Sequence, residues 1–279
     1  FKGMKEVKQL LDEMAILKMN TFHWHLTEDQ GWRIEIKKYP LLTEIGAHRD
    51  STQLNWYESK VFDGKPFDGY YTQREIKEIV SYARNLHITV VPEIEMPGHA
   101  SAAIAAYPWL GSTDEKIKVP CTFGVKNSAF NVADPRTRTF LKDVLDEVME
   151  LFPSRIIHIG GDEVRQEQWN NSSEVRTFMK EKGLNSAAEL QMWFTNHIAS
   201  YLKSKGRIMM GWNDITGDKL HGYQSEVTIE AGNQLSEDAV VQFWTGNHDL
   251  LRKAAKRGYK IVNSYFKYTY LNFNHDRIT

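Results

Sequence analysis

Two adjacent carboxylates, Asp162 and Glu163, follow an apolar run that ends in two glycines, Gly160 and Gly161. Residues 155–159 have the composition of a buried strand, and consecutive side chains of a regular strand point to opposite faces. Glycines allow the backbone to leave that geometry, so both carboxylates can turn into one pocket. Acids on a tight loop after a strand are typical of barrel enzymes. Taken alone, this segment also fits a turn at the end of a strand, with both acidic side chains in solvent.

The other strand ends predicted from the sequence also carry polar or aromatic side chains. A single His, Trp or Asp at one such position usually has a structural role, but side chains of these kinds at the ends of six strands indicate a functional site. The groups, in chain order, are His23, Trp24, His25, Glu28 and Asp29; Glu93, Glu95 and His99; Asp162 and Glu163; Trp212, Asn213 and Asp214; Trp244; and Tyr265, Tyr268 and Tyr270.

Helix and strand signals alternate along the chain, which predicts a parallel sheet. The spacing of apolar residues predicts a helix over 2–18. Capping boxes predict that helices begin at Thr72 and Ser186, and the pair Asp134-Pro135 predicts a further helix start. A further helix is expected at 249–257. Strands are expected at 21–26, 87–94, 156–159, 207–210, 239–244 and 260–263.

Long polar segments follow the expected strands, whereas the segments before them are short. This asymmetry places function at the carboxyl ends of the strands. About six strands are too few for a closed eight-stranded barrel. The pattern therefore leaves two folds open, a piece of a barrel or an open doubly wound sheet.

Composition excludes several classes of protein. The 279 residues suit one large domain or two small ones, and 41% hydrophobic and 25% charged residues are ordinary for a globular protein. A formal net charge of −1 gives no electrostatic reason to expect a nucleic-acid or membrane partner. We find no apolar run of transmembrane length. The single cysteine, Cys121, excludes an internal disulfide and a cysteine-based metal cluster.

Two chemistries fit these residues. His23 and His25 with later acids and His99 could begin the metal site of an amidohydrolase, but that site needs further ligands on later strands. Those strands end in Trp212 and Trp244, and an indole is no metal ligand. Glycoside hydrolysis needs a protonated carboxyl beside the leaving oxygen. Adjacent carboxylates suit a mechanism in which the substrate supplies its own nucleophile, so that one carboxyl is the acid and the other holds the substrate group.

The chain resembles the catalytic domain of family 20 glycoside hydrolases, the β-N-acetylhexosaminidases. The matching stretches occur in family order and span nearly the whole chain. They are FHWHLTEDQGWR (22–33), PEIEMPGH (92–99), HIGGDE (158–163), GWND (211–214) and QFW (242–244). The resemblance implies an α/β fold, a TIM (β/α)8 barrel, and a retaining, substrate-assisted mechanism, an exception to the two-carboxylate scheme.

The resemblance also assigns roles. Glu163 is expected to be the general acid and base, and Asp162 to hold the N–H of the substrate's 2-acetamido group. Trp212 and Trp244 are expected to wall the acetamido pocket, and the Tyr270 hydroxyl is expected to bind the acetamido oxygen. His99 is expected beside Glu163, and Glu28 or Asp29 should contact sugar hydroxyls or His99. Asp214 and Asn272 are expected to make further contacts with the substrate. No metal and no cofactor are implied.

Two residues depart from the usual family pattern, because Glu28 and Asn272 stand where an aspartate is common. Residues 1–279 are expected to be one catalytic barrel domain whose first strand, with a substrate-binding arginine, and last strand, with a tryptophan and a glutamate, lie outside this sequence. The expected partner is an oligosaccharide or glycoconjugate with a terminal N-acetylhexosamine, in a secreted, periplasmic or lysosomal setting. The rivals are a carbohydrate-binding pseudoenzyme, the metal hydrolase, and a lacto-N-biosidase-like enzyme of the same family.

Overall fold

A sheet of six parallel strands brings the polar strand ends to one edge. The computed structural model describes residues 1–113, 115–224 and 234–271. In the sheet the strands follow one another in the order β1-β4-β5-β6-β7-β8. Their bounds are β1 (Thr21–His25), β4 (Thr89–Glu93), β5 (Ile156–His158), β6 (Ile208–Trp212), β7 (Val240–Phe243) and β8 (Lys260–Asn263).

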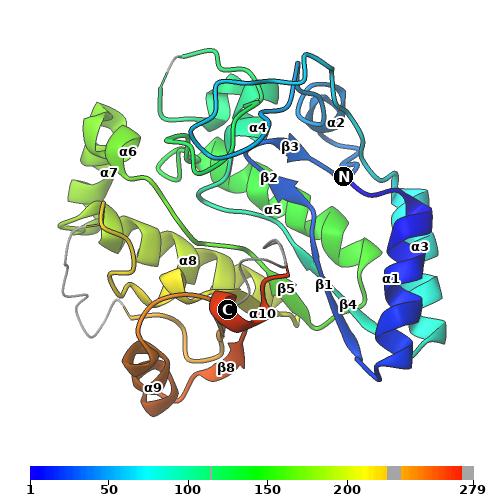
Figure 1. Ribbon diagram of the computed structural model, residues 1–279. Helices are drawn as coiled ribbons and strands as arrows, with labels where there is room; N and C mark the ends of the chain where they lie inside the picture. Colours follow the sequence, from blue (N-terminus) through cyan, green and yellow to red (C-terminus); the bar gives the residue numbers. More distant parts are fainter. Residues whose placement is uncertain (114, 225–233, 272–279) are drawn as a thin grey trace.

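The strand order distinguishes the two folds that the sequence left open. A doubly wound sheet reverses its strand order at a switch point, whereas this sheet keeps chain order from one edge to the other. The strands curl into an incomplete barrel (Figure 1). The expectation of an incomplete (β/α)8 barrel is therefore confirmed for the described residues.

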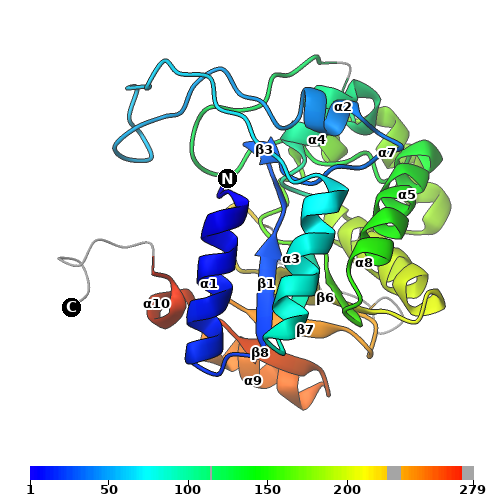
Figure 2. The ribbon, with the colours of Figure 1, turned by 90° about the vertical axis from the view of Figure 1, so that its right-hand side faces the viewer.

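Helices cover the outer face of the sheet, and Figure 2 shows α1, α3 and α5 standing side by side there. The α-helices are α1 (Met4–Ile16), α2 (Leu41–Glu44), α3 (Gln73–Asn85), α4 (Ser101–Ala106), α5 (Pro135–Leu151), α6 (Glu167–Asn171), α7 (Ser173–Lys182), α8 (Ala187–Ser204), α9 (His248–Lys256) and α10 (Phe266–Thr269). Within the described residues there are also two 3-10 helices, η1 (Pro108–Leu110) and η2 (Asn213–Thr216).

The long segments after β1 and β4 lie over the carboxyl ends of the strands (Figure 2). One of them forms a hairpin that the sequence did not predict, in which β2 (Thr27–Glu28) pairs antiparallel with β3 (Gly31–Trp32). The turn of this hairpin places Asp29 inside the protein, where its side chain is fully buried. Among the described residues, no helix has the length and apolar character needed to cross a membrane.

Two of the predicted helix starts have the expected caps. At α3, the Thr72 side chain accepts a hydrogen bond from the Glu75 N–H, and the Glu75 carboxylate accepts from the Thr72 N–H at 2.8 Å. At α5, the Asp134 carboxylate accepts from the Arg136 N–H at 2.7 Å. Each cap satisfies backbone donors that a helix leaves free at its start.

The capping box expected at Ser186 is only half right. Its side chain accepts from the Glu189 N–H at 3.2 Å, as expected. The Glu189 carboxylate instead accepts from the N–H of Asn185, one residue before the cap, at 2.6 Å. The sequence pattern identifies the helix start but cannot fix which of two neighbouring N–H groups the glutamate reaches.

The Thr72 cap should contribute measurably to stability. We expect Thr72→Ala to lower the free energy of unfolding by about 1 kcal/mol, because it leaves the Glu75 N–H without its acceptor. Urea unfolding would measure the change. Thr139→Ala is the control, since Thr139 is exposed within α5 and alanine is the better helix former. Equal effects of the two substitutions would contradict the capping assignment.

Candidate active site

The loop after β5 turns both acids to the same side by using left-handed backbone. Gly160 and Gly161 have φ of +65° and +87°, and Glu163 itself has φ of +51°. A Cβ on Gly160 would lie 1.7 Å from Oε2 of Glu95, so only glycine fits there. The non-glycine residue Glu163 adopts a conformation that costs about 1–3 kcal/mol.

Two side-chain contacts hold this loop in place. The Asp214 carboxylate accepts a hydrogen bond from the Glu163 N–H at 3.1 Å, and Gln191 Nε2 donates to the Gly161 carbonyl at 3.0 Å. Asp214 follows β6 and Gln191 lies on α8. The loop is thus fixed both from the neighbouring strand and from the helix behind it.

His99 lies at the centre of four carboxylates. Its Nδ1 is 2.7 Å from Glu28 and 3.3 Å from Asp29, and its Nε2 is 3.5 Å from both Asp162 and Glu163. The imidazole is almost completely buried. It therefore connects the β2–β3 hairpin to the loop after β5.

These contacts shift the pKa values of the residues around His99. Although burial opposes its charge, Asp162, Asp29 and Glu163 hold the pKa of His99 well above its ordinary value, so the ring is an imidazolium near neutral pH. Burial likewise opposes ionisation of Asp29, but hydrogen bonds from His99 and Ser101 lower its pKa. Burial raises the pKa of Asp162 to about 6, against the opposing effect of His99.

Glu28 and Asp29 differ in what they can reach. The Asp29 carboxylate is fully buried and accepts from the Ser101 N–H and hydroxyl and from the Lys126 N–H. The Glu28 side chain is 36% exposed and also contacts His99. Of the two, Glu28 is therefore the carboxylate that a solvent-borne hydroxyl could approach.

The indoles of Trp212 and Trp244 are each held by a buried carboxylate. Trp212 Nε1 donates to Glu93 at 2.7 Å, and Trp244 Nε1 donates to Asp214 at 2.9 Å. The two rings meet edge to face, with centroids 6.4 Å apart and planes at 70°. Because the Asp214 carboxylate also accepts from the Glu163 N–H, it lies between the acid loop and the aromatic wall.

The tyrosines after β8 have different environments. Tyr270 is partly exposed, and burial together with the charges of Asp162 and Glu163 raises its pKa to about 12, so its hydroxyl keeps its proton near neutral pH. Tyr265 is buried and stacks on Phe243. Tyr268 is 79% exposed. Asn272 lies outside the described residues.

Sequence reasoning missed His221. Its Nε2 is 2.8 Å from Oδ1 of Asp214, and its ring stacks on Tyr223, which lies under the guanidinium of Arg165. Burial opposes its protonation, but Asp214 and Glu163 raise the pKa of His221. His221 belongs to an irregular segment after η2, where no motif or periodicity indicated a functional residue.

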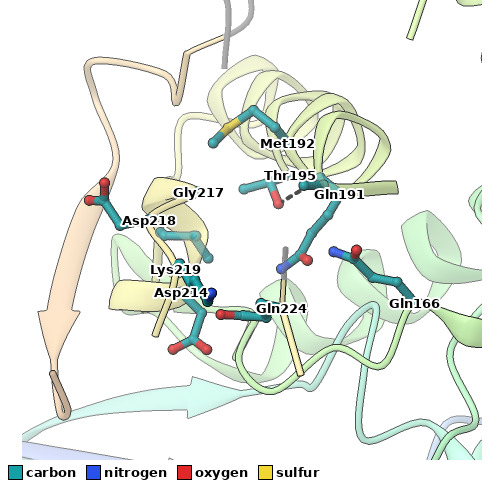
Figure 3. A pocket seen from close by; sticks show the side chains of 11 residues that line it. Gln166, Gln191, Met192, Thr195, Asp214, Gly217, Asp218, Lys219 and Gln224 are labelled. Carbon is teal, nitrogen blue, oxygen red and sulfur yellow. Dashed lines mark hydrogen bonds between the residues drawn. The ribbon is translucent and has the colours of Figure 1, made fainter. Parts of the chain in front are cut away.

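A small cavity lies behind Asp214, between α8 and η2 (Figure 3). Its volume of about 30 Å³ is enough for a single water. Gln191, Thr195 and Gln166 contribute polar groups to its wall, whereas the Asp214 carboxylate points away from it in Figure 3. This cavity is therefore too small for a sugar.

Several sets of imidazole and carboxylate groups are close enough to hold a metal ion. Their ligand atoms lie within 4.8 Å of one another, in the sets His23, Glu93 and His158; His25, Glu93 and Glu95; Glu28, Asp29 and His99; and His99, Asp162 and Glu163. The metal hydrolase considered from the sequence needs ligands from β6 and β7 as well. Trp212 and Trp244 stand at the ends of those strands, and their N–H groups bind carboxylates.

Comparison with known proteins gives a consistent family assignment. Residues 1–279 match the model of the glycosyl hydrolase family 20 catalytic domain. A beta-hexosaminidase of Vibrio furnissii is 38% identical over 277 residues, which cover 99% of this chain and 43% of the relative. A beta-hexosaminidase of Porphyromonas gingivalis is 38% identical over 268 residues, covering 92% of this chain and 31% of the relative.

Solved structures agree with this assignment. A β-N-acetylhexosaminidase from Bacteroides fragilis has 40% identity and a TM-score of 0.78, over 98% of this chain and 50% of that one. An exo β-N-acetylglucosaminidase of the family from Vibrio harveyi, in complex with N-acetylglucosamine, has 34% identity and a TM-score of 0.81, over 98% of this chain and 40% of that one. The chain thus spans half or less of the length of these relatives.

The raised pKa of Asp162 predicts a specific pH dependence of stability. The folded protein binds a proton at Asp162 up to about pH 6, whereas the unfolded chain releases it near its ordinary value of 3.8. This group's contribution to stability is therefore full below about pH 4 and is lost as the pH rises through about 6. Asp162→Asn removes the titration, so its stability relative to wild type should rise between pH 4 and 7, by on the order of 2 kcal/mol.

Urea unfolding at several pH values would test this. Asp134→Asn is the control, because the bonds with Arg136 lower the pKa of Asp134 although burial opposes this, so its effect should be nearly constant over that range. A pH-independent difference between wild type and Asp162→Asn would contradict the raised pKa.

Proposed function

Because this chain belongs to glycosyl hydrolase family 20, we propose that it carries the catalytic centre of an exo-acting β-N-acetylhexosaminidase. The substrate is a glycan that ends in β-linked N-acetylglucosamine or N-acetylgalactosamine. The observation that carries the proposal is the environment of Asp162. Its Oδ1 is buried and has no hydrogen-bond partner among the described residues, so it can accept from the N–H of an acetamido group.

The neighbouring carboxyl supplies the acid. Glu163 donates its proton to the glycosidic oxygen while the acetamido oxygen of the substrate attacks the anomeric carbon. The bond to the leaving group breaks and a cyclic oxazolinium forms, with its N–H on Asp162. A water then attacks the anomeric carbon and gives its proton to Glu163, which restores the acid and retains the β configuration.

The surrounding residues support these two steps. The ionised form of Asp162, which dominates above about pH 6, stabilises the positive charge that develops on the acetamido nitrogen. Trp212 and Trp244 wall the acetamido group, and the Tyr270 hydroxyl donates to its oxygen. His99 balances the charge of the two acids, and Glu28 is the carboxylate placed to bind a sugar hydroxyl.

The first experiment compares two aryl glycosides that differ only in the acetamido group. We expect cleavage of the N-acetyl-β-glucosaminide and no comparable cleavage of the β-glucoside, because only the first carries its own nucleophile. Equal cleavage of both would mean that a protein carboxylate is the nucleophile. Cleavage of neither would favour the carbohydrate-binding pseudoenzyme.

The role of Glu163 predicts a dependence on the leaving group. Glu163→Gln should lower kcat/KM by about 100-fold or more for poor aryl leaving groups, which need protonation, and much less for good ones. Glu167→Gln, at an exposed position on α6, is the control and should leave both rates unchanged. Equal losses for good and poor leaving groups would contradict the assignment of Glu163 as the acid.

A further inference from the structure

Glu93 is a fully buried carboxylate at the last position of β4, directly behind the aromatic wall. The register of the sheet pairs Glu93 with His25 on β1 and with His158 on β5. On its inner side it accepts a 2.7 Å hydrogen bond from Trp212 Nε1. Four strands of the sheet, β1, β4, β5 and β6, thus contribute to one buried cluster.

Three histidines surround this carboxylate. Oε2 of Glu93 is 2.8 Å from His23 Nε2 and 3.6 Å from His25 Nδ1, and Oε1 is 3.1 Å from His158 Nδ1. Burial lowers the pKa of His158 to about 4, so this third ring is neutral near neutral pH. Although burial opposes ionisation, His25 holds the pKa of Glu93 well below its ordinary value. The indole N–H therefore donates to a charged acceptor, which makes a stronger bond than a neutral one.

The Trp212 ring also has aromatic neighbours. Its ring neighbours are His158, His23 and Trp244, with centroids at 5.1, 5.7 and 6.4 Å. The χ2 torsion of a tryptophan is broad, and none of these three rings stacks face to face on Trp212. A donor fixed on a buried carboxylate selects one orientation.

We propose that Glu93 is a positioning residue that fixes the Trp212 ring and thereby sets the size of the N-acyl group that the pocket accepts. This inference rests on the proposed function, in which Trp212 walls the acetamido group. Asp214 holds Trp244 in a similar way but also binds the Glu163 N–H. Among the described residues, the polar partners of the Glu93 carboxylate are Trp212 and the three histidines. A substitution of Glu93 therefore tests the pocket without removing a contact of Glu163.

Selectivity between acyl groups tests the inference. The readout is the ratio of kcat/KM for aryl N-acetyl- and N-propionyl-β-glucosaminides, which differ by one methylene. Such a difference is worth about 10- to 200-fold in a well-defined apolar pocket. Glu93→Asp keeps the charge but draws the carboxylate away from the indole, and should lower the ratio about tenfold. Glu93→Gln keeps the reach and an acceptor oxygen, and should stay within about twofold of wild type.

A buried glutamate elsewhere provides the control. Glu189→Gln changes a buried carboxylate at the start of α8 and should alter stability without altering the ratio. The inference is overturned if Glu93→Asp keeps the wild-type ratio, or if Glu93→Gln lowers the ratio as much as Glu93→Asp does. Wild-type protein that cleaves the N-acetyl glycoside no faster than the plain glucoside would overturn the proposed function, and the inference with it.

Discussion

The pairing of buried negative charge with His99 is the interaction on which the site depends. Carboxylates from the hairpin after β1 and from the loop after β5 both approach this one ring. Without a positive charge between them, ionised Asp29 and Asp162 would each lie in a low-dielectric setting without compensation, which costs several kcal/mol per ion. The imidazolium allows the two loops to approach each other.

The need to compensate buried negative charge also explains why tryptophans and carboxylates occur together at these strand ends. A buried carboxylate needs donors, and an indole N–H is a donor without any acceptor capacity. Glu93 and Asp214 each accept from one indole. In each pair the acid gains a hydrogen bond and the indole N–H gains an acceptor, so charge compensation and the placing of the rings involve the same contacts.

Much of the fold follows from local sequence signals. The cap at Thr72 and the strand at 260–263 match the structure, because short-range hydrogen bonding and apolar periodicity determine them. The hairpin around Asp29 was not predicted, since its two short strands have no periodicity to detect. The burial of Asp29 also depends on Ser101, which lies 72 residues away in the sequence. Contacts of that range become visible only when the strands are assembled.

The sequence names the side chains that meet around His99, including its contacts with Glu163 and with Glu28 or Asp29, but not the other partners of these carboxylates. Asp214 is expected to contact substrate, and the sequence does not show that its carboxylate also binds Trp244, His221 and the Glu163 N–H. Strand ends show which side chains meet at one edge of a sheet. They do not show how many lone pairs of each carboxylate remain free after the protein's own donors have been satisfied.

The adjacency of Asp162 and Glu163 then has a physical explanation. A regular strand would send neighbouring side chains to opposite faces, and the left-handed backbone at Gly160, Gly161 and Glu163 prevents that. The strain at Glu163 persists because the loop is held by Asp214 on one side and by α8 on the other. The structure thus holds two equivalent carboxyls in different surroundings, with one oxygen of Asp162 buried and unpartnered among the described residues. In the proposed mechanism, this difference in surroundings allows neighbouring residues to perform separate steps of one reaction.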